Sequence, residues 1–224
     1  MVTNLQIPRR LAPVPKPPSW LRGDWRFVEG AGTVSGDLSR YRNQGTLVGC
    51  SWGTGEIGSA LSFSDGNEYL RIADAPSLRL DGPFTLVAKI KRDATQANGY
   101  GVAVTKGINY ILYTLNNGKV GFGYQDTGGS WREFYTTDLI AADEWHTIIV
   151  TAVPSTTTAC VIYLDGVASK SQTLTGVPTT SSYAVFIGRA WYDDYRYKGL
   201  IDVVMILGLA LSASEVAALH AAIS

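Results

Sequence analysis

Apolar and polar residues alternate in short runs along most of the chain from Trp20 onwards. The runs are rich in Val, Ile, Tyr, Phe and Thr, and Gly, Asn and Asp separate them. The repeat is two residues rather than the 3.6 of a helix, so each run predicts a β-strand. The 24 glycines are spread along the chain, which is typical of many tight turns with positive φ. The pattern predicts an all-β domain.

Two turn sequences indicate hairpins. Asp165-Gly166 follows the apolar run 159–164, and the turn 116–118 (NNG) separates 110–115 from 119–124. Asp-Gly and Asn-Gly favour the turns that join antiparallel strands. Further strands are predicted at 84–90, 145–151 and 183–187. Some of these runs alternate and others are continuously apolar, a mixture that suits a two-layer sandwich.

One short helix is predicted at the C-terminal end. Ser212 and Glu215 have the spacing of a capping box, and Leu211 can pack on Val216 as a hydrophobic staple. The helix body, 216–223, is rich in Ala and short. We therefore interpret it as a support for the sandwich rather than a functional element.

The beginning of the chain follows neither pattern. Five of the nine prolines fall within the first eighteen residues, which excludes a regular helix or a central strand there. We expect residues 1–19 to form an extended arm and residues 20–224 to form one domain. The start also lacks the continuous apolar stretch of a secretory signal, so export by that route is not expected.

Composition and charge narrow the choice of partner. Nineteen basic residues balance nineteen acidic ones, and no Lys/Arg run is long enough to follow a phosphate backbone, so nucleic acid is not an expected partner. No apolar run is long enough to span a membrane. With twelve Tyr and six Trp, the composition suits a neutral ligand such as a glycan, or a protein surface.

Two cysteines, Cys50 and Cys160, lack the spacing of a zinc site or a redox motif. We expect both to be small apolar residues in the interior. A single disulfide is the alternative, and the sequence leaves it open, because it requires Cα atoms within about 7 Å of each other.

Six motifs follow one another between residues 25 and 219. They are WRFVEGAG (25–32) with DLSRYRNQGTLVG (37–49), GSALSF (58–63) with NEYL (67–70), PSLRLDGPFTL (76–86), EWH (144–146) with VIYLDG (161–166), IGR (187–189) with KGLID (198–202), and ALSASE (210–215). Their order is similar to that of laminin-G-like domains of the concanavalin A-like lectin/glucanase superfamily. The resemblance implies a two-sheet antiparallel jelly-roll sandwich, with an extended N-terminal arm and a short C-terminal helix added to it.

The superfamily includes hydrolases, but this chain lacks the acidic triplet of its glucanase members. The glucanase members carry acids in an E-x-D-x-E arrangement, whose alternate residues face one groove. No such triplet occurs here, and the acids of 143–144 and 193–194 are adjacent, so on a strand they would face opposite sides. His146 is interpreted as a structural residue. We therefore expect a protein that binds rather than an enzyme.

Calcium is the one cofactor that the resemblance implies. Family members hold it with residues whose positions here are Asp37, Asn43 and Asp202, oxygen donors of the kind a hard cation prefers. The chain departs from the family pattern at Val203 and Met205. The alternative is that Asp37 caps a turn and that Asp202 accepts hydrogen bonds from backbone amides.

Exposed aromatic residues are the candidates for ligand binding. A sugar ring presents an apolar C–H face that stacks on an indole or phenol ring. The candidate residues are Trp131, Trp191, Tyr192, Tyr195 and Tyr197. The alternative is that the loop 191–197 packs on the sandwich or on a neighbouring subunit.

Two functions of different classes remain open. Stand-alone jelly rolls with a Pro-rich basic arm resemble phage capsid-decoration and tail proteins. Arg9, Arg10 and Lys16 would then seat the arm on other subunits of an assembly at the virion surface. We favour this attachment or decoration function. The alternative is a free-standing, secreted carbohydrate-binding lectin-like module, and the sequence leaves open whether it depends on calcium.

Overall fold

A computed structural model describes residues 17–64, 66–96, 99–192 and 195–224. Most of the predicted arm, with its basic residues Arg9, Arg10 and Lys16, lies outside the described residues.

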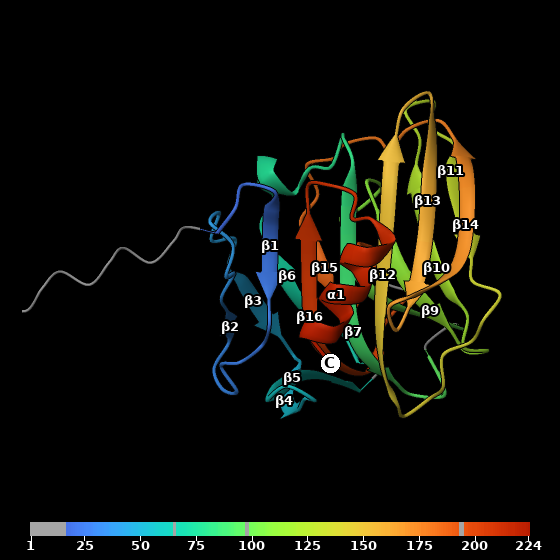
Figure 1. The fold of residues 1–224 in the computed structure, drawn as a ribbon. Helices are drawn as coiled ribbons and strands as arrows, with labels where there is room; N and C mark the ends of the chain where they lie inside the picture. The colour runs from blue at the N-terminus through green and yellow to red at the C-terminus, as the bar shows by residue number, and fades with distance from the viewer. Residues whose placement is uncertain (1–16, 65, 97–98, 193–194) are drawn as a thin grey trace, which may run out of the picture.

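Two antiparallel sheets pack face to face in a sandwich (Figure 1), which confirms the predicted fold class. Within the described residues each sheet has eight strands. Sheet A contains β1 (Leu21–Trp25), β4 (Ser51–Thr54), β5 (Ser59–Ser64), β7 (Phe84–Arg92), β12 (Trp145–Pro154), β13 (Thr157–Leu164), β14 (Val167–Thr175) and β16 (Lys198–Leu207). Their order is β14-β13-β12-β7-β16-β5-β4, and β1 pairs with β16.

Sheet B carries the remaining strands. They are β2 (Val34–Ser35), β3 (Gly45–Val48), β6 (Tyr69–Ile72), β8 (Tyr100–Thr105), β9 (Ile111–Leu115), β10 (Val120–Gln125), β11 (Trp131–Tyr135) and β15 (Val185–Ile187). Their order is β11-β10-β9-β8-β15-β6-β3-β2. A short 3₁₀ helix, η1 (Pro76–Leu78), and one α-helix, α1 (Ala213–Ala222), complete the described elements.

The predicted hairpins and helix are present. β13 and β14 pair across Asp165 and Gly166, which both have positive φ, as a tight hairpin turn requires. β9 and β10 pair across the turn at 116–118. Helix α1 has the predicted capping box, in which Ser212 accepts from the backbone N–H of Glu215 while the Glu215 side chain accepts from that of Ser212.

The main core lies between the sheets and contains Cys160 but not Cys50, which is only partly buried against it. Both thiols are free, so the structure does not form the alternative disulfide. Burial raises the pKa of the Cys160 thiol to about 12 and also raises that of Cys50. Both thiols are therefore protonated at neutral pH, and the thiolate, which is the reactive form of cysteine, is scarce.

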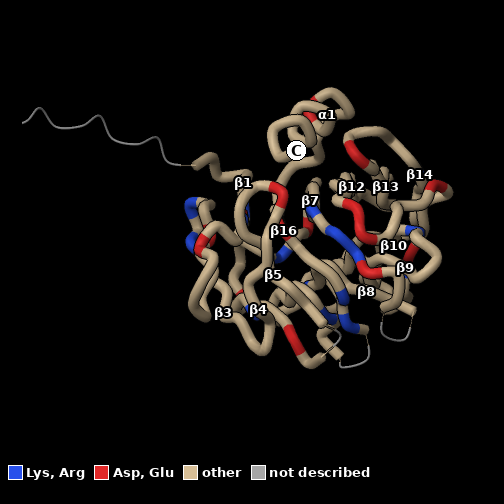
Figure 2. Tube along the Cα trace, turned by 90° about the horizontal axis from the view of Figure 1, so that it is seen from below, with Lys and Arg blue, Asp and Glu red and all other residues tan. Residues whose placement is uncertain are grey.

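The outer faces of the two sheets differ. Helix α1 packs on the outer face of sheet A, where Val216 and Ile223 join a second apolar cluster with Val87 and Ile149 (Figure 1). The described helices leave the outer face of sheet B uncovered. On the side seen in Figure 2, basic and acidic positions are interspersed and form no continuous basic band. No helix among the described residues is long and apolar enough to cross a membrane.

Candidate ligand-binding site

Strand β10 creates a shallow floor on the outer face of sheet B. Val120, Phe122 and Tyr124 point into the core, so the alternate positions Gly121 and Gly123 face outwards. A Cβ at Gly121 would lie 2.4 Å from Cζ of the neighbouring tyrosine ring on β9, and one at Gly123 would lie 2.9 Å from a β11 carbonyl. These glycines leave room for side chains of the flanking strands to lie across β10.

Aromatic rings fill this room in a continuous row. The ring of Tyr113 on β9 lies 6.0 Å from that of Tyr135 on β11, across Gly121. On its other side Tyr113 lies 5.6 Å from Tyr100 of β8, which is 4.7 Å from Tyr195. Tyr195 in turn lies 5.4 Å from Tyr192. Three strands and the loop before β16 thus bring their rings to one surface.

Glu133 of β11 joins the row to an indole. Its Oε2 accepts hydrogen bonds from Tyr113 Oη at 2.8 Å and from Trp131 Nε1 at 3.0 Å. Burial is the main cause that raises the pKa of Tyr113 far above its usual range and that of Tyr135 to about 12. The hydroxyl of Tyr113 therefore keeps its proton and donates to Glu133 across the working range of pH.

These side chains line a half-open cavity that we call the aromatic pocket. It is lined by Tyr100, Val102, Ile111, Tyr113, Trp131, Glu133, Tyr192 and Tyr195. Its volume of about 210 Å³ is below the roughly 300–1,000 Å³ of sites for drug-sized molecules. It suits a single ring or a compact head group of a larger ligand.

The structure brings together three of the five predicted ligand-binding residues. Trp131, Tyr192 and Tyr195 line the aromatic pocket, although the first is some sixty positions from the others in sequence. Trp191 lies beside the pocket, its ring 5.0 Å from that of Tyr192.

The prediction that Tyr197 binds a ligand is wrong, because its ring belongs to the main core. It is 1% exposed, its ring meets that of Phe63 edge-on at 5.9 Å, and its hydroxyl donates to the carbonyl of Leu200 at 3.3 Å. The residue directly precedes β16, which pairs with β5 and draws this ring inwards. Tyr197 therefore offers no face to a ligand.

Sequence reasoning missed Tyr100, Tyr113 and Glu133. Only the strand of Tyr113 is among the predicted strands, and nothing in that strand alone distinguishes an outward tyrosine from an inward one. The strands of Tyr100 and Glu133 are not among those predicted. The available signal was the alternation of Gly121 and Gly123 on β10, because a strand that lacks side chains on one face marks a close approach by other groups.

The residues expected to hold calcium do not fit that ion as a set. Asp37 Oδ1 accepts from the N–H groups of Asp24 and Ser39, and Oδ2 accepts from the Ser39 hydroxyl and the Asn43 N–H, all at 2.7–2.9 Å. These four bonds use the lone-pair capacity of the carboxylate.

Asp202 has a separate set of partners, the N–H groups of Glu56 and Ile57, each at 3.0 Å. Its Oδ1 is buried without a hydrogen-bond partner, and burial raises its pKa. No cluster of three or more His, Cys, Asp or Glu side chains suited to a metal occurs among the described residues. The contacts match the alternative, turn capping by Asp37 and amide binding by Asp202.

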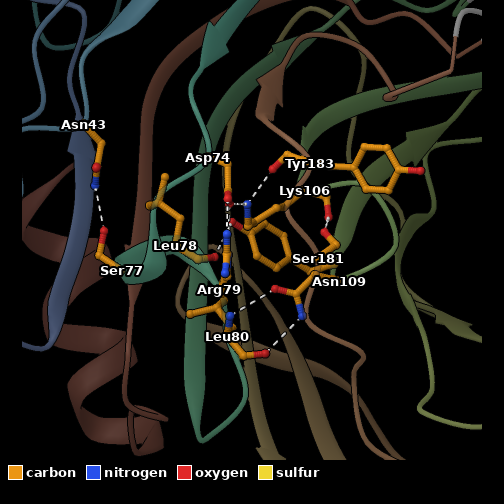
Figure 3. Close-up of polar contacts among 11 residues, drawn as sticks. Asn43, Asp74, Ser77, Leu78, Arg79, Leu80, Lys106, Asn109, Ser181 and Tyr183 are labelled. Atoms are coloured by element: carbon orange, nitrogen blue, oxygen red, sulfur yellow. Dashed lines mark hydrogen bonds and ion pairs between the residues drawn. The ribbon is translucent and has the colours of Figure 1, made fainter.

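A polar network around the side chain of Lys106 holds the backbone of Tyr183 (Figure 3). Lys106 is fully buried, and its Nζ contacts Asp74 Oδ1 and donates to the carbonyl of Tyr183, each at 2.5 Å. The ring of Tyr183 lies 4.9 Å from that of Trp191. Arg79 binds the same aspartate. The network therefore fixes the backbone at Tyr183, whose ring packs beside that of Trp191.

Asp74 is expected to make stability fall in acid. Its hydrogen bond with Arg79 is the main cause that holds its pKa at about 2, below the ordinary 3.8. A depressed pKa stabilises the folded state above about pH 4, and this stability is lost as pH falls towards 2. The variant Asp74→Asn keeps an oxygen for Lys106 but cannot titrate. Urea unfolding should show that the free energy of unfolding falls less between pH 4 and pH 2 for the variant than for the wild type. Equal falls would contradict the assignment of this acid sensitivity to Asp74.

Comparisons with known proteins agree with this architecture. The family model Laminin_G_3, described as the concanavalin A-like lectin/glucanases superfamily, matches residues 64–217. No curated protein sequence matches the chain.

Three solved structures illustrate the similarity in fold. The binding domain of Paraclostridial Mosquitocidal Protein 1 has a TM-score of 0.73 and 16% identity, over 91% of this chain and 52% of that chain. The second structure is Domain 4 of AbnA, a GH43 extracellular arabinanase from Geobacillus stearothermophilus, in complex with arabinotriose. It has a TM-score of 0.69 and 21% identity, over 89% of this chain and 98% of that chain. The Botulinum Neurotoxin serotype G binding domain has a TM-score of 0.70 and 13% identity, over 90% of this chain and 51% of that chain. The chain thus spans about half the length of the two toxin structures and nearly all of the arabinanase domain.

Proposed function

Since the chain belongs to the concanavalin A-like lectin/glucanases superfamily, we propose that it is a non-catalytic module that binds glycans in the aromatic pocket of sheet B. The observation that carries the proposal is the convergence of rings from β8, β9, β11 and the loop before β16 around one small cavity. Such a cavity has the apolar walls and the few polar groups that a ligand site requires.

The pocket has the two kinds of group that a sugar needs. The exposed faces of Trp131 and Tyr192, which are 42% and 39% exposed, can stack on the C–H face of a sugar ring. Glu133, at the wall, can accept hydrogen bonds from hydroxyl groups. The half-buried Tyr195 and Tyr100 extend the apolar surface between them.

The same geometry argues against hydrolysis of the bound sugar. Glycosidases place two carboxyl groups on opposite sides of the bond they cut, whereas Glu133 is the only charged side chain among the described residues that line the pocket. His146 is engaged elsewhere: its Nε2 accepts from the backbone N–H of Ala141 at 3.1 Å, so its Nδ1 donates to Asp165 at 2.8 Å. It supports the β13–β14 hairpin.

The arabinanase domain supports this proposal, because its structure was solved with arabinotriose and the chain covers nearly all of it. That enzyme is described as extracellular. We accordingly propose that this module also works outside the cell, or on a particle surface, where glycans are displayed.

An attachment role in a virion is a second proposal, and it rests on the sequence. Residues 1–19 would anchor the domain 20–224 to other subunits through a stiff, basic segment. The two proposals are compatible, because an anchored decoration or tail protein can present a glycan-binding face.

A glycan array tests the proposed function. The wild-type protein should retain at least one class of oligosaccharide, and free oligosaccharide of the same kind should compete. Binding should persist after treatment with a chelator, because the pocket uses rings and one carboxylate rather than a metal. An array with no retained glycan would contradict the proposal.

A further inference from the structure

The described lining of the aromatic pocket carries negative charge only. Glu133 is the only charged group among the described residues that line it, and the groups that hydrogen-bond to it, on Tyr113, Trp131 and Tyr135, are all neutral. No lysine or arginine in the described part of the chain forms an ion pair with it. The neighbouring Arg132 binds Asp126 Oδ2 instead, at 2.7 Å. The negative charge of Glu133 is therefore left for a ligand.

The two donors beside Glu133 are already used. The hydroxyl of Tyr113 and the indole N–H of Trp131 both donate to Oε2 of Glu133. Beside Glu133 a ligand therefore meets carboxylate lone pairs and the faces of aromatic rings. A group that brings its own donors fits this side of the pocket.

The faces of the aromatic rings add to the negative potential of the pocket. The face of a tyrosine or tryptophan ring is the negative side of its quadrupole and attracts cations within about 6 Å of its centre. Rings of Tyr100, Tyr113, Tyr192, Tyr195 and Trp131 surround the cavity. Rings and carboxylate together attract a cation and repel an anion.

We propose that the aromatic pocket prefers glycans that carry a free ammonium group, that is, non-acetylated amino sugars. This inference rests on the proposed function, because it names the ligand class of the same site. The ammonium would lie against the ring faces and Glu133, while the sugar ring stacks on Trp131. N-acetylation would remove the positive charge and enlarge the group that a cavity of about 210 Å³ must hold.

A charged probe and its neutral isostere test the cation preference without any sugar. Choline and 3,3-dimethylbutan-1-ol have the same shape and differ in charge. The wild-type protein should bind choline about tenfold more tightly in an NMR titration, as expected for roughly 1.4 kcal/mol from cation–π and charge contacts. Glu133→Gln should remove most of this difference. Glu133 is exposed, and glutamine keeps an oxygen for both donors, so the variant should fold.

Glu144→Gln is the matched control, since it removes an equal charge from an exposed residue outside the pocket and should leave the preference intact. Equal affinity for choline and its isostere, or a preference unchanged by Glu133→Gln, would overturn the inference.

A glycan arm separates this inference from the proposed function. Glucosamine oligosaccharides should bind more tightly than N-acetylglucosamine oligosaccharides, and Glu133→Gln should make the two equal. Equal binding of both by the wild type would overturn the inference and leave glycan binding in place. Binding of choline but of no oligosaccharide would instead contradict the proposed function.

Discussion

Replacing Asp37 by Ala should lower the free energy of unfolding by about 3 kcal/mol or more, the largest stability effect we expect from one polar residue. Its carboxylate accepts from the backbone N–H groups of Asp24, Ser39 and Asn43. Asp37 is 2% exposed, so water cannot easily replace it, and each buried donor left unpaired costs about 1–3 kcal/mol. Urea unfolding followed by tryptophan fluorescence measures the loss.

Asp81→Ala is the control for this prediction, because Asp81 is exposed. Its free energy of unfolding should change by no more than about 0.5 kcal/mol. If a chelator destabilised the wild type as much as Asp37→Ala does, a bound metal rather than the backbone amides would be the partner of this carboxylate, and our description of the loop would be wrong.

Replacing Trp131 by Ala should weaken glycan binding by about thirtyfold, equivalent to about 2 kcal/mol, the scale of an aromatic residue at the centre of a binding site. The indole provides the most exposed ring face in the aromatic pocket and also donates to Glu133. Stability should hardly change, since the side chain is 42% exposed on an edge strand. Isothermal titration with a glycan retained on the array measures the affinity.

Trp20 provides a matched control, because it is also 42% exposed and lies beside α1 and β16 rather than at the aromatic pocket. Trp20→Ala should bind the glycan as the wild type does. An equal loss of affinity in both variants would move the site away from sheet B.

The fold could be predicted from sequence because its signals are local. Asp165-Gly166 favours its turn wherever it occurs in the chain, and Ser212 with Glu215 caps a helix from within four residues. The period of two then assigns each run to a strand. Six motifs in order identified the family that residues 64–217 match.

The site was predicted only in part, because it depends on which strands become neighbours. The sequence predicts Trp131 and Tyr195 as exposed aromatic candidates, but their meeting depends on the order β11-β10-β9-β8 in sheet B. Tyr197 shows the opposite error. It shares its loop with Tyr195, yet the pairing of the following strand β16 turns its ring into the core, and loop composition does not reveal such a direction.

NMR mapping of a glycan titration tests most directly the central claim that the outer face of sheet B is the binding surface. The account predicts that the indole N–H of Trp131 and the amides of Gly121 and Gly123 shift together, with the same dissociation constant as the titration. Shifts confined to α1 and the outer face of sheet A, with those three signals unmoved, would contradict it.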